Sequence, residues 1–193
     1  MKLKYIFLYL GPILLLVGGF WFGTKISSRS QIDNQVLASG SIEKFKFLSA
    51  QNTNKCGMVL ENFDSLVDGD RIQGSCCSAM DLHRYQEQVE GLKKYSKYSV
   101  IPEDPYDIPV SLAKELFGYQ KEINLTSEQQ KIYDDAVNIS RERGPCCCKC
   151  WRWSAFEGQS KYLIVNEGFE ASQISELWDL QDGCGGPNHL GHT

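Results

Sequence analysis

The chain has 193 residues, eight of them cysteines, and its formal net charge at pH 7 is -4. Its aliphatic and aromatic content is sufficient for a hydrophobic core, so folding does not depend on disulfides or on a bound metal. Residues 1–30 contain basic but no acidic side chains, so the rest of the chain is distinctly acidic, which argues against nucleic acid as a partner and favours cations.

An uncharged, mainly apolar stretch covers residues 5–23 and follows Lys2 and Lys4. Its length is close to the roughly 20 residues that span a bilayer as a helix. It ends in Phe20-Trp21-Phe22, which is more typical of an interfacial anchor than of a signal-peptide cleavage site. We therefore expect residues 1–26 to form an N-terminal transmembrane helix, with a cleaved signal sequence as the alternative. The short N-terminal tail favours a single-pass protein in the cell membrane, with its C-terminal domain outside the cytoplasm.

The polar segment over residues 27–55 is rich in Ser, Gln and Asn and is predicted to be a tether. Within it, residues 42–48 show a short alternating pattern that indicates a strand. The remaining residues, 56–193, are predicted to form one cysteine-rich domain.

Helical patterns dominate this domain. The first runs from about Ala79 to Lys97, where Leu82, Tyr85, Val89 and Leu92 recur at a spacing of three or four residues. Further helices are predicted at about 111–119, from Thr126 to about Arg143, from Trp151 to a C-cap at Gly168, and at about 172–180. Gly144-Pro145 is expected to stop the helix that runs to about Arg143. The fold class is therefore mainly α, with little or no β.

The densest chemical feature is the run Pro-Cys-Cys-Cys-Lys-Cys-Trp, directly after the predicted helix stop. Neighbouring cysteines bridge each other only in strained geometry, whereas clustered thiolates suit a soft metal ion or thiol exchange. Either a helical or an extended backbone would bring at least two of these thiols together. The candidate ligands of this first group are Cys146, Cys147, Cys148 and Cys150.

A second group combines Cys76 and Cys77 with Met80 and His83. If the helix includes them, Cys76, Met80 and His83 share one stripe, nearly opposite the apolar face. Thiolate, thioether and imidazole together favour Cu(I) over hard cations. A third group lies in the glycine-rich tail, where Cys184 precedes His189 and His192.

Other uses of these cysteines remain open. Four clustered and four scattered cysteines could form four disulfides in an exported domain, as in a stapled accessory subunit of a membrane complex. A thiol–disulfide oxidoreductase could use adjacent cysteines, although the Cys-x-x-Cys of thioredoxin-like enzymes is missing. A structural zinc site is also compatible with the composition, but the paired Cys-x-x-Cys spacing of zinc ribbons is absent.

The segment Pro145 to Cys150 resembles the motif of a family of exported, membrane-attached bacterial proteins named for Pro-Cys-Tyr-Cys-Gly-Cys. The upstream Tyr133-Asp134-Asp135-Ala136 is similar to the Tyr-x-x-Ala element that precedes the motif in that family. The resemblance implies that Cys146, Cys148 and Cys150 are the motif thiols, in an extracytoplasmic and metal-related role. This chain has Cys147 and Lys149 in place of the motif's Tyr and Gly, and it has no lipid-attachment cysteine.

These patterns lead to the hypothesis of a membrane-anchored binding protein for a soft metal, with Cu(I) expected ahead of zinc. Sequestration or transfer is expected rather than catalysis, because no general base or substrate pocket is evident from the sequence. The expected partners are the membrane, through residues 5–23, a soft metal ion, and a membrane protein.

Overall fold

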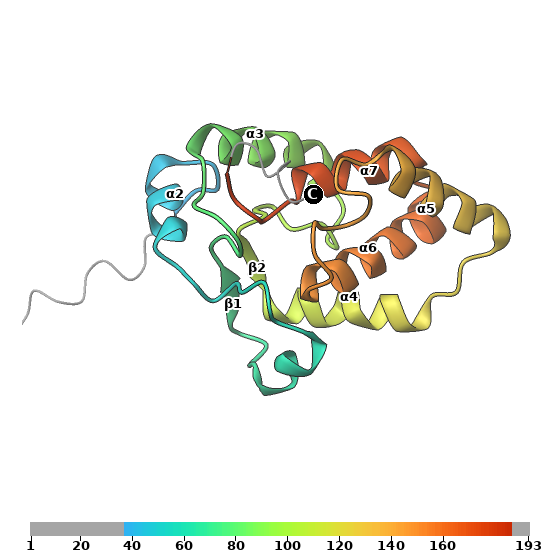
Figure 1. The fold of residues 1–193 in the computed structure, drawn as a ribbon, viewed down its shortest axis with the longest axis horizontal. Helices are drawn as coiled ribbons and strands as arrows, with labels where there is room; N and C mark the ends of the chain where they lie inside the picture. The colour runs from blue at the N-terminus through green and yellow to red at the C-terminus, as the bar shows by residue number, and fades with distance from the viewer. Residues whose placement is uncertain (1–36, 187–193) are drawn as a thin grey trace, which may run out of the picture. The chain divides into compact units, whose positions relative to one another are not determined.

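We describe a computed structural model of the protein over residues 37–186. Within this range the chain is mainly helical, as predicted, and its β structure is limited to one small two-stranded sheet. The elements, coloured in chain order in Figure 1, are α2 (Ile42–Ser49), the 3-10 helix η1 (Leu60–Ser65), β1 (Arg71–Gln73), α3 (Leu82–Leu92), the 3-10 helix η2 (Lys93–Tyr95), β2 (Asp107–Pro109), α4 (Val110–Glu122), α5 (Ser127–Ile139), α6 (Trp151–Glu167) and α7 (Ala171–Leu180).

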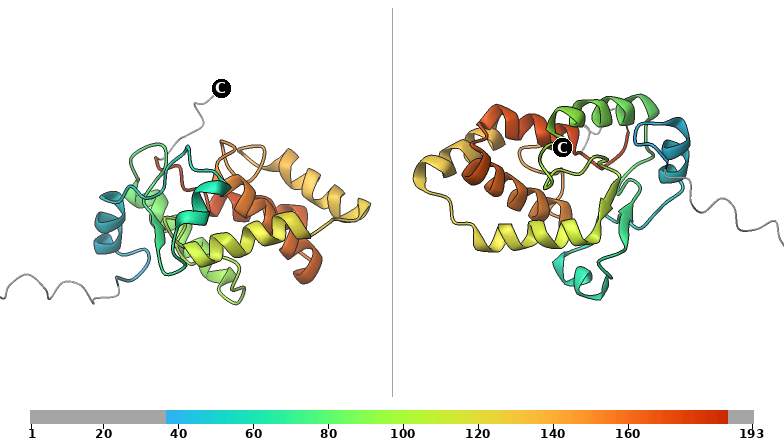
Figure 2. Two further views of the ribbon diagram at one scale, coloured as in Figure 1. Left: turned by 90° about the horizontal axis from the view of Figure 1, so that it is seen from below. Right: turned by 180° about the vertical axis from the view of Figure 1, so that it is seen from behind.

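Helices α4 and α6 lie alongside each other, and α7 packs between α5 and α3 (Figures 1 and 2). The close approach of α4 and α6 depends on Gly158, because a Cβ atom at this position would lie 2.0 Å from the carbonyl oxygen of Leu116. Strands β1 and β2 pair antiparallel, with Ile72 opposite Ile108, and join the segment after η1 to the start of α4.

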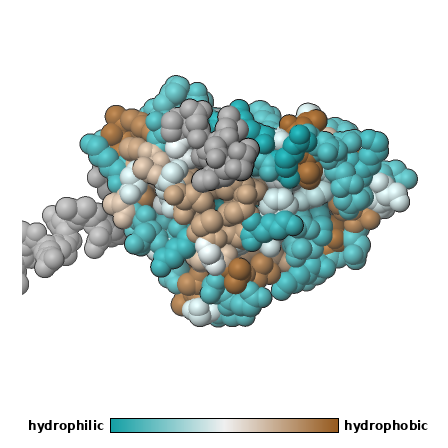
Figure 3. Space-filling model, in the orientation of Figure 1, coloured by the Kyte–Doolittle hydropathy of each residue, from teal (hydrophilic) through white to brown (hydrophobic). Residues whose placement is uncertain are grey.

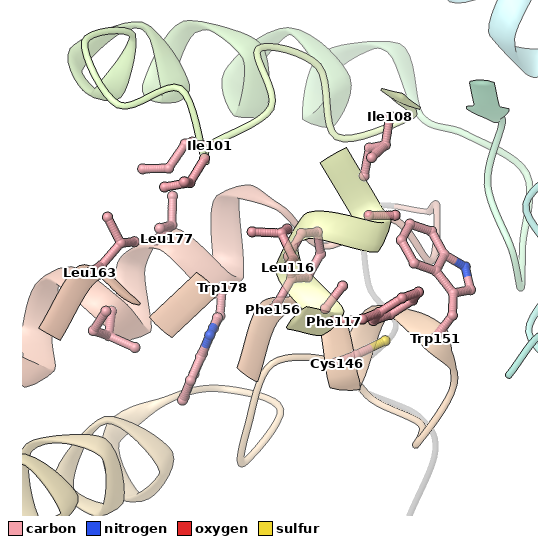
Figure 4. Close-up of a cluster of buried hydrophobic side chains, with 14 of the residues drawn as sticks. Ile101, Ile108, Leu116, Phe117, Cys146, Trp151, Phe156, Leu163, Leu177 and Trp178 are labelled. Carbon is pink, nitrogen blue, oxygen red and sulfur yellow. The ribbon is translucent and has the colours of Figure 1, made fainter. Parts of the chain in front are cut away.

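The main core lies between these helices and contains large buried aromatic side chains. Phe63 packs edge-on against Phe117 and also contacts Trp151, so the 3-10 helix η1 covers the end of the α4–α6 pair. Figure 4 shows Cys146 at the same end of this core as Phe117 and Trp151. In Figure 3, hydrophilic residues cover most of the visible face, moderately hydrophobic ones lie at its centre, and the most hydrophobic ones form small separate patches nearer its edges.

Several helix signals act as the sequence predicts. The Thr126 side chain accepts a hydrogen bond from the backbone N–H of Gln129, and the Gln129 side chain accepts one from Thr126, which completes a capping box at α5. Helix α6 ends at Gly168 in the left-handed conformation, with φ of 66°. The apolar stripe of α3 is also confirmed, since Tyr85, Val89 and Leu92 are buried.

The prediction of a strand at residues 42–48 is wrong, because this segment is helix α2. The Ser41 side chain caps it by accepting a hydrogen bond from the backbone N–H of Lys44. Leu48 is fully buried with Tyr85 and Val89 of α3. Residues 37–55 of the predicted tether therefore belong to the folded unit, and residues 27–36 lie outside the described residues.

Two predicted helix boundaries also need correction. Helix α3 begins at Leu82 with Asp81 as its N-cap, because the Asp81 carboxylate accepts a hydrogen bond from the N–H of Arg84. Helix α5 ends at Ile139, four residues before the predicted stop at Arg143. Ser140 is already extended there, and its hydroxyl oxygen accepts a hydrogen bond from the N–H of Gly144.

Among residues 37–186, no helix combines the length and the apolar character needed to cross a bilayer. The predicted anchor at residues 5–23 lies outside the described residues, so it stays a prediction.

Candidate metal centre

The structure brings all eight cysteines of the chain together from four separate segments. Cys56 comes from the loop before η1, and Cys76 and Cys77 from the loop between β1 and α3. The run from Cys146 to Cys150 joins α5 to α6, and Cys184 follows α7. All eight are free thiols. The first group and the cysteines of the other two groups therefore form one cluster, which we call the thiol cluster.

Short sulfur–sulfur distances connect these segments. The Sγ atom of Cys184 lies 3.1 Å from that of Cys147 and 3.7 Å from that of Cys76. Within their own segments, the sulfurs of Cys76 and Cys77 are 3.4 Å apart and those of Cys146 and Cys150 are 4.0 Å apart. Cys184 therefore links the two main groups that the sequence leaves separate.

Backbone hydrogen bonds hold Cys184 against the loop before α3. The N–H of Cys76 donates to the carbonyl of Gly183 at 3.1 Å, and the N–H of Ser78 donates to that of Cys184 at 2.9 Å. The Ser78 hydroxyl also donates to the Cys184 carbonyl, at 3.0 Å. These contacts fix the register of the two loops and thereby bring Cys76 and Cys184 together.

Cys56 is a member of the cluster that sequence reasoning missed. Its Sγ atom lies 3.2 Å from that of Cys148. Trp151 positions this segment, because its ring N–H donates to the Asn54 side chain at 3.0 Å and its backbone N–H donates to the carbonyl of Met58 at 2.9 Å. No local pattern distinguishes Cys56, which has no cysteine or histidine near it in the sequence.

Burial varies systematically across the cluster. Cys146, Cys150 and Cys184 are buried, whereas Cys56 and Cys77 are exposed. The other three cysteines are partly buried. The cluster thus runs from the hydrophobic core to the surface, which would allow an ion to reach buried thiols through exposed ones.

A buried cation lies beside the cluster. Arg152, in the first turn of α6, is 1% exposed and donates from Nη1 to the carbonyl of Gln181 and from Nη2 to that of Pro105. Its Nε atom is buried without a hydrogen-bond partner. A Cβ atom on Gly183 would lie 2.2 Å from the guanidinium carbon, so Arg152 is packed directly against the residue before Cys184.

Hydrogen bonds between the thiols lower the pKa values of two of them and raise those of their neighbours. The hydrogen bond with Cys184, helped by the charge of Arg152, lowers the pKa of Cys76 to about 6 although burial opposes it. Hydrogen bonds from Cys147, Cys148 and Cys150 lower the pKa of Cys146. The same bonds to Cys146, together with burial, raise the pKa values of these neighbours and of Cys184. Burial, followed by the contact with Cys76, raises the pKa of Cys77 to about 12.

Three groups of three sulfurs are close enough to hold an ion, with every pair of sulfurs in a group within 4.8 Å. The groups, which we call triads, are Cys76–Cys77–Cys184, Cys146–Cys147–Cys184 and Cys146–Cys148–Cys150. Thiolates in this number and spacing match the ligand preference of soft metal ions.

The predicted stripe of Cys76, Met80 and His83 does not form, because α3 begins only at Leu82. The Met80 thioether sulfur instead lies 3.8 Å from the Ser49 hydroxyl and packs beside α2. The His83 side chain is 84% exposed and contacts Glu87 at 3.1 Å. His83 belongs to none of the triads, while His189 and His192 lie outside the described residues.

Comparison of the chain with protein families, with characterised proteins and with solved structures finds no match.

Proposed function

We propose that this protein binds Cu(I) through the thiol cluster and serves to sequester the ion or transfer it. The observation that carries the proposal is the convergence of eight free thiols from four segments distant in sequence. Cys146, Cys150 and Cys184 also pack in the main apolar core, but Cys56 and Cys77 are exposed and lie outside that core, so packing alone does not account for the convergence. It is the arrangement that a soft ion requires.

The grouping of the sulfurs favours Cu(I) over zinc. Structural zinc is almost always held by four ligands in a tetrahedron. The close groups in this cluster are sets of three thiols, and three thiolates around one ion suit the low coordination numbers of Cu(I). The acidic thiols of Cys76 and Cys146 supply thiolate for the first contact with an ion.

We also propose that residues 5–23 anchor the protein in the cell membrane, with residues 37–186 outside the cytoplasm, where a membrane protein exchanges copper with it. The apolar N-terminal stretch and the resemblance of Pro145–Cys150 to the Pro-Cys-Tyr-Cys-Gly-Cys motif support this location. Protease access to the C-terminal domain in intact cells tests it, and protection of that domain would contradict it.

The direct test is to purify the full chain anaerobically, add Cu(I), and measure bound copper against a competing Cu(I) chelator. Free thiols are counted in parallel. We expect copper to be retained and thiols to become unreactive together. Substoichiometric copper with all eight thiols still reactive would contradict the proposal. His83→Gln is a matched control, because this imidazole is exposed and lies outside the triads, so it should leave copper binding unchanged.

A second candidate is a domain stabilised by four disulfide bonds, in which the cysteines have a purely structural role. Four of the sulfur–sulfur contacts together pair all eight cysteines: Cys56–Cys148, Cys76–Cys77, Cys146–Cys150 and Cys147–Cys184. However, a bridge between the adjacent Cys76 and Cys77 would be strained. Intact mass before and after reduction separates the candidates, since four bridges would take up eight hydrogen atoms.

A further inference from the structure

We infer that the thiol cluster holds three Cu(I) ions as one unit, with the sulfurs of Cys146 and Cys184 each bridging two ions. This inference rests on the proposed function and specifies the form in which the metal is bound. It goes beyond Cu(I) binding as such, which a single ion in any one triad would satisfy.

The sharing of thiols between triads carries the inference. Cys184 belongs to the first and second triads, and Cys146 belongs to the second and third. Three ions, each with three sulfur ligands, need nine ligand positions, and seven cysteines provide them only if two are shared. The two residues that recur are therefore the bridges, and the ions form a chain in the order of the triads.

The distances fit trigonal coordination. Three thiolates about 2.3 Å from one ion, in a plane with it, are about 4.0 Å from each other. The sulfurs of Cys76 and Cys184 are 3.7 Å apart, and those of Cys146 and Cys150 are 4.0 Å apart. The shorter contact of 3.1 Å between Cys147 and Cys184 needs only a small side-chain adjustment to reach that spacing.

The two shared thiols are also well placed to act as bridges. Cys146 is 2% exposed and Cys184 is 1% exposed, so water does not compete for their second lone pair. The terminal ligand Cys77 is exposed by comparison, and Cys148 is partly buried. A thiolate sulfur in a protected position can bind two soft ions at once, which is what a bridge requires.

The positive charge of the buried Arg152 can offset part of the negative charge of the copper–thiolate cluster. Each ligand that is still protonated releases its proton when it binds copper, and the copper remains Cu(I), so no electron is transferred. Seven thiolates around three monovalent ions leave an excess of negative charge. Arg152 is buried beside Gly183, and its Nε–H has no hydrogen-bond partner, so this donor is free to face the anionic cluster.

The experiment is a Cu(I) titration of the full chain under anaerobic conditions, followed by metal analysis and X-ray absorption at the copper edge. We expect saturation at three Cu(I) per chain, sulfur-only coordination with three neighbours, and a copper–copper scattering shell. Copper bound at any other ratio, or at three per chain without that shell, would overturn the bridged cluster and leave copper binding intact. No retained copper would instead overturn the proposed function itself.

Single substitutions test which residues bridge. Cys184→Ser removes two of the nine ligand positions, so it should lower the saturating ratio and reduce the copper–copper shell. Cys56→Ser is the matched control, because Cys56 lies in the cluster but outside the triads, and it should retain three ions. Equal losses in the two variants would contradict the assignment. Circular dichroism is used to check that each variant is folded. If a variant does not fold, the copper titration of the unmodified chain still tests the inference.

Discussion

Gly183 lies directly against the guanidinium group of Arg152, at a position where a Cβ atom would be 2.2 Å from Cζ and 2.3 Å from Nη2. The next residue is Cys184, whose backbone is hydrogen-bonded to the loop that carries Cys76. The absence of a side chain at Gly183 thus allows the buried cation and the shared thiol to be neighbours.

We predict that Gly183→Ala displaces either Arg152 or the Cys184 loop. Overpacking of this kind costs about 1–3 kcal/mol of unfolding free energy. Copper affinity should fall as well, because Cys184 takes part in two triads. Chemical denaturation and chelator competition measure the two effects.

The matched control is Gly69→Ala, since no atom lies within 4 Å of a Cβ at that position. It should leave both stability and copper affinity close to those of the unmodified chain. A Gly183→Ala protein that behaves like this control would show that the contact is not important.

The metal-free protein should contain one unusually reactive accessible thiol, Cys76. Its pKa is lowered to about 6, by the hydrogen bond with Cys184 first and by Arg152 in addition. Alkylation of Cys76 by iodoacetamide should therefore be half-maximal near pH 6, whereas Cys77, with a pKa raised to about 12, should react slowly at neutral pH. Peptide mass spectrometry resolves the two sites.

Cys184→Ala should move the Cys76 alkylation profile to higher pH, because it removes the principal hydrogen-bond partner of the thiolate. An unchanged profile would mean that Cys184 does not lower the pKa of Cys76.

Copper affinity should rise with pH. The pKa values of Cys147, Cys148, Cys150 and Cys184 are raised, chiefly by their contacts with Cys146, so these thiols carry protons at pH 7. Each must lose its proton to bind Cu(I), and the affinity should change about tenfold per pH unit for each proton released. Chelator competition at pH 6 and pH 8, with proton release measured by a pH dye, tests this. Affinity independent of pH would contradict thiol ligation.

The sequence predicts the helices well where local signals decide them. The Thr126 capping box and the Gly168 C-cap act within a few residues of themselves, so each marks the correct end of a helix. The segment at residues 42–48 was mispredicted because its alternation is weak, and burial of Leu48 against α3 stabilises the helix instead.

In the candidate site too, the sequence reveals the residues that are adjacent in the chain but not those brought in by long-range contacts. The run from Cys146 to Cys150 is visible in the sequence because its members are adjacent. The place of Cys56 depends on the Trp151–Asn54 hydrogen bond across 97 residues, which no local pattern reveals. Met80 and His83 share a stripe with Cys76 only if the helix extends back to Cys76, six residues before its observed start at Leu82.

Asp107 should determine much of the stability of the β1–β2 region at neutral pH. Its carboxylate is 5% exposed and accepts hydrogen bonds from Lys44, from Arg71 at 2.5 Å and from Gln73 at 3.0 Å. Burial opposes ionisation, but these three donors outweigh it and hold the pKa of Asp107 below its ordinary value. Asp107→Asn should therefore lower the free energy of unfolding by about 2–4 kcal/mol near pH 7.

The pH dependence identifies the cause of that loss. A carboxylate with a lowered folded-state pKa stabilises the protein fully above its unfolded pKa of about 4, and the contribution disappears as the pH falls through the folded-state value. The difference between the unmodified chain and Asp107→Asn should thus be constant from pH 7 to about pH 5 and shrink below pH 4. Asp135→Asn, which removes an exposed ion pair with Lys131, should have far less effect. A difference that persists unchanged at pH 2 would show that shape rather than charge is responsible.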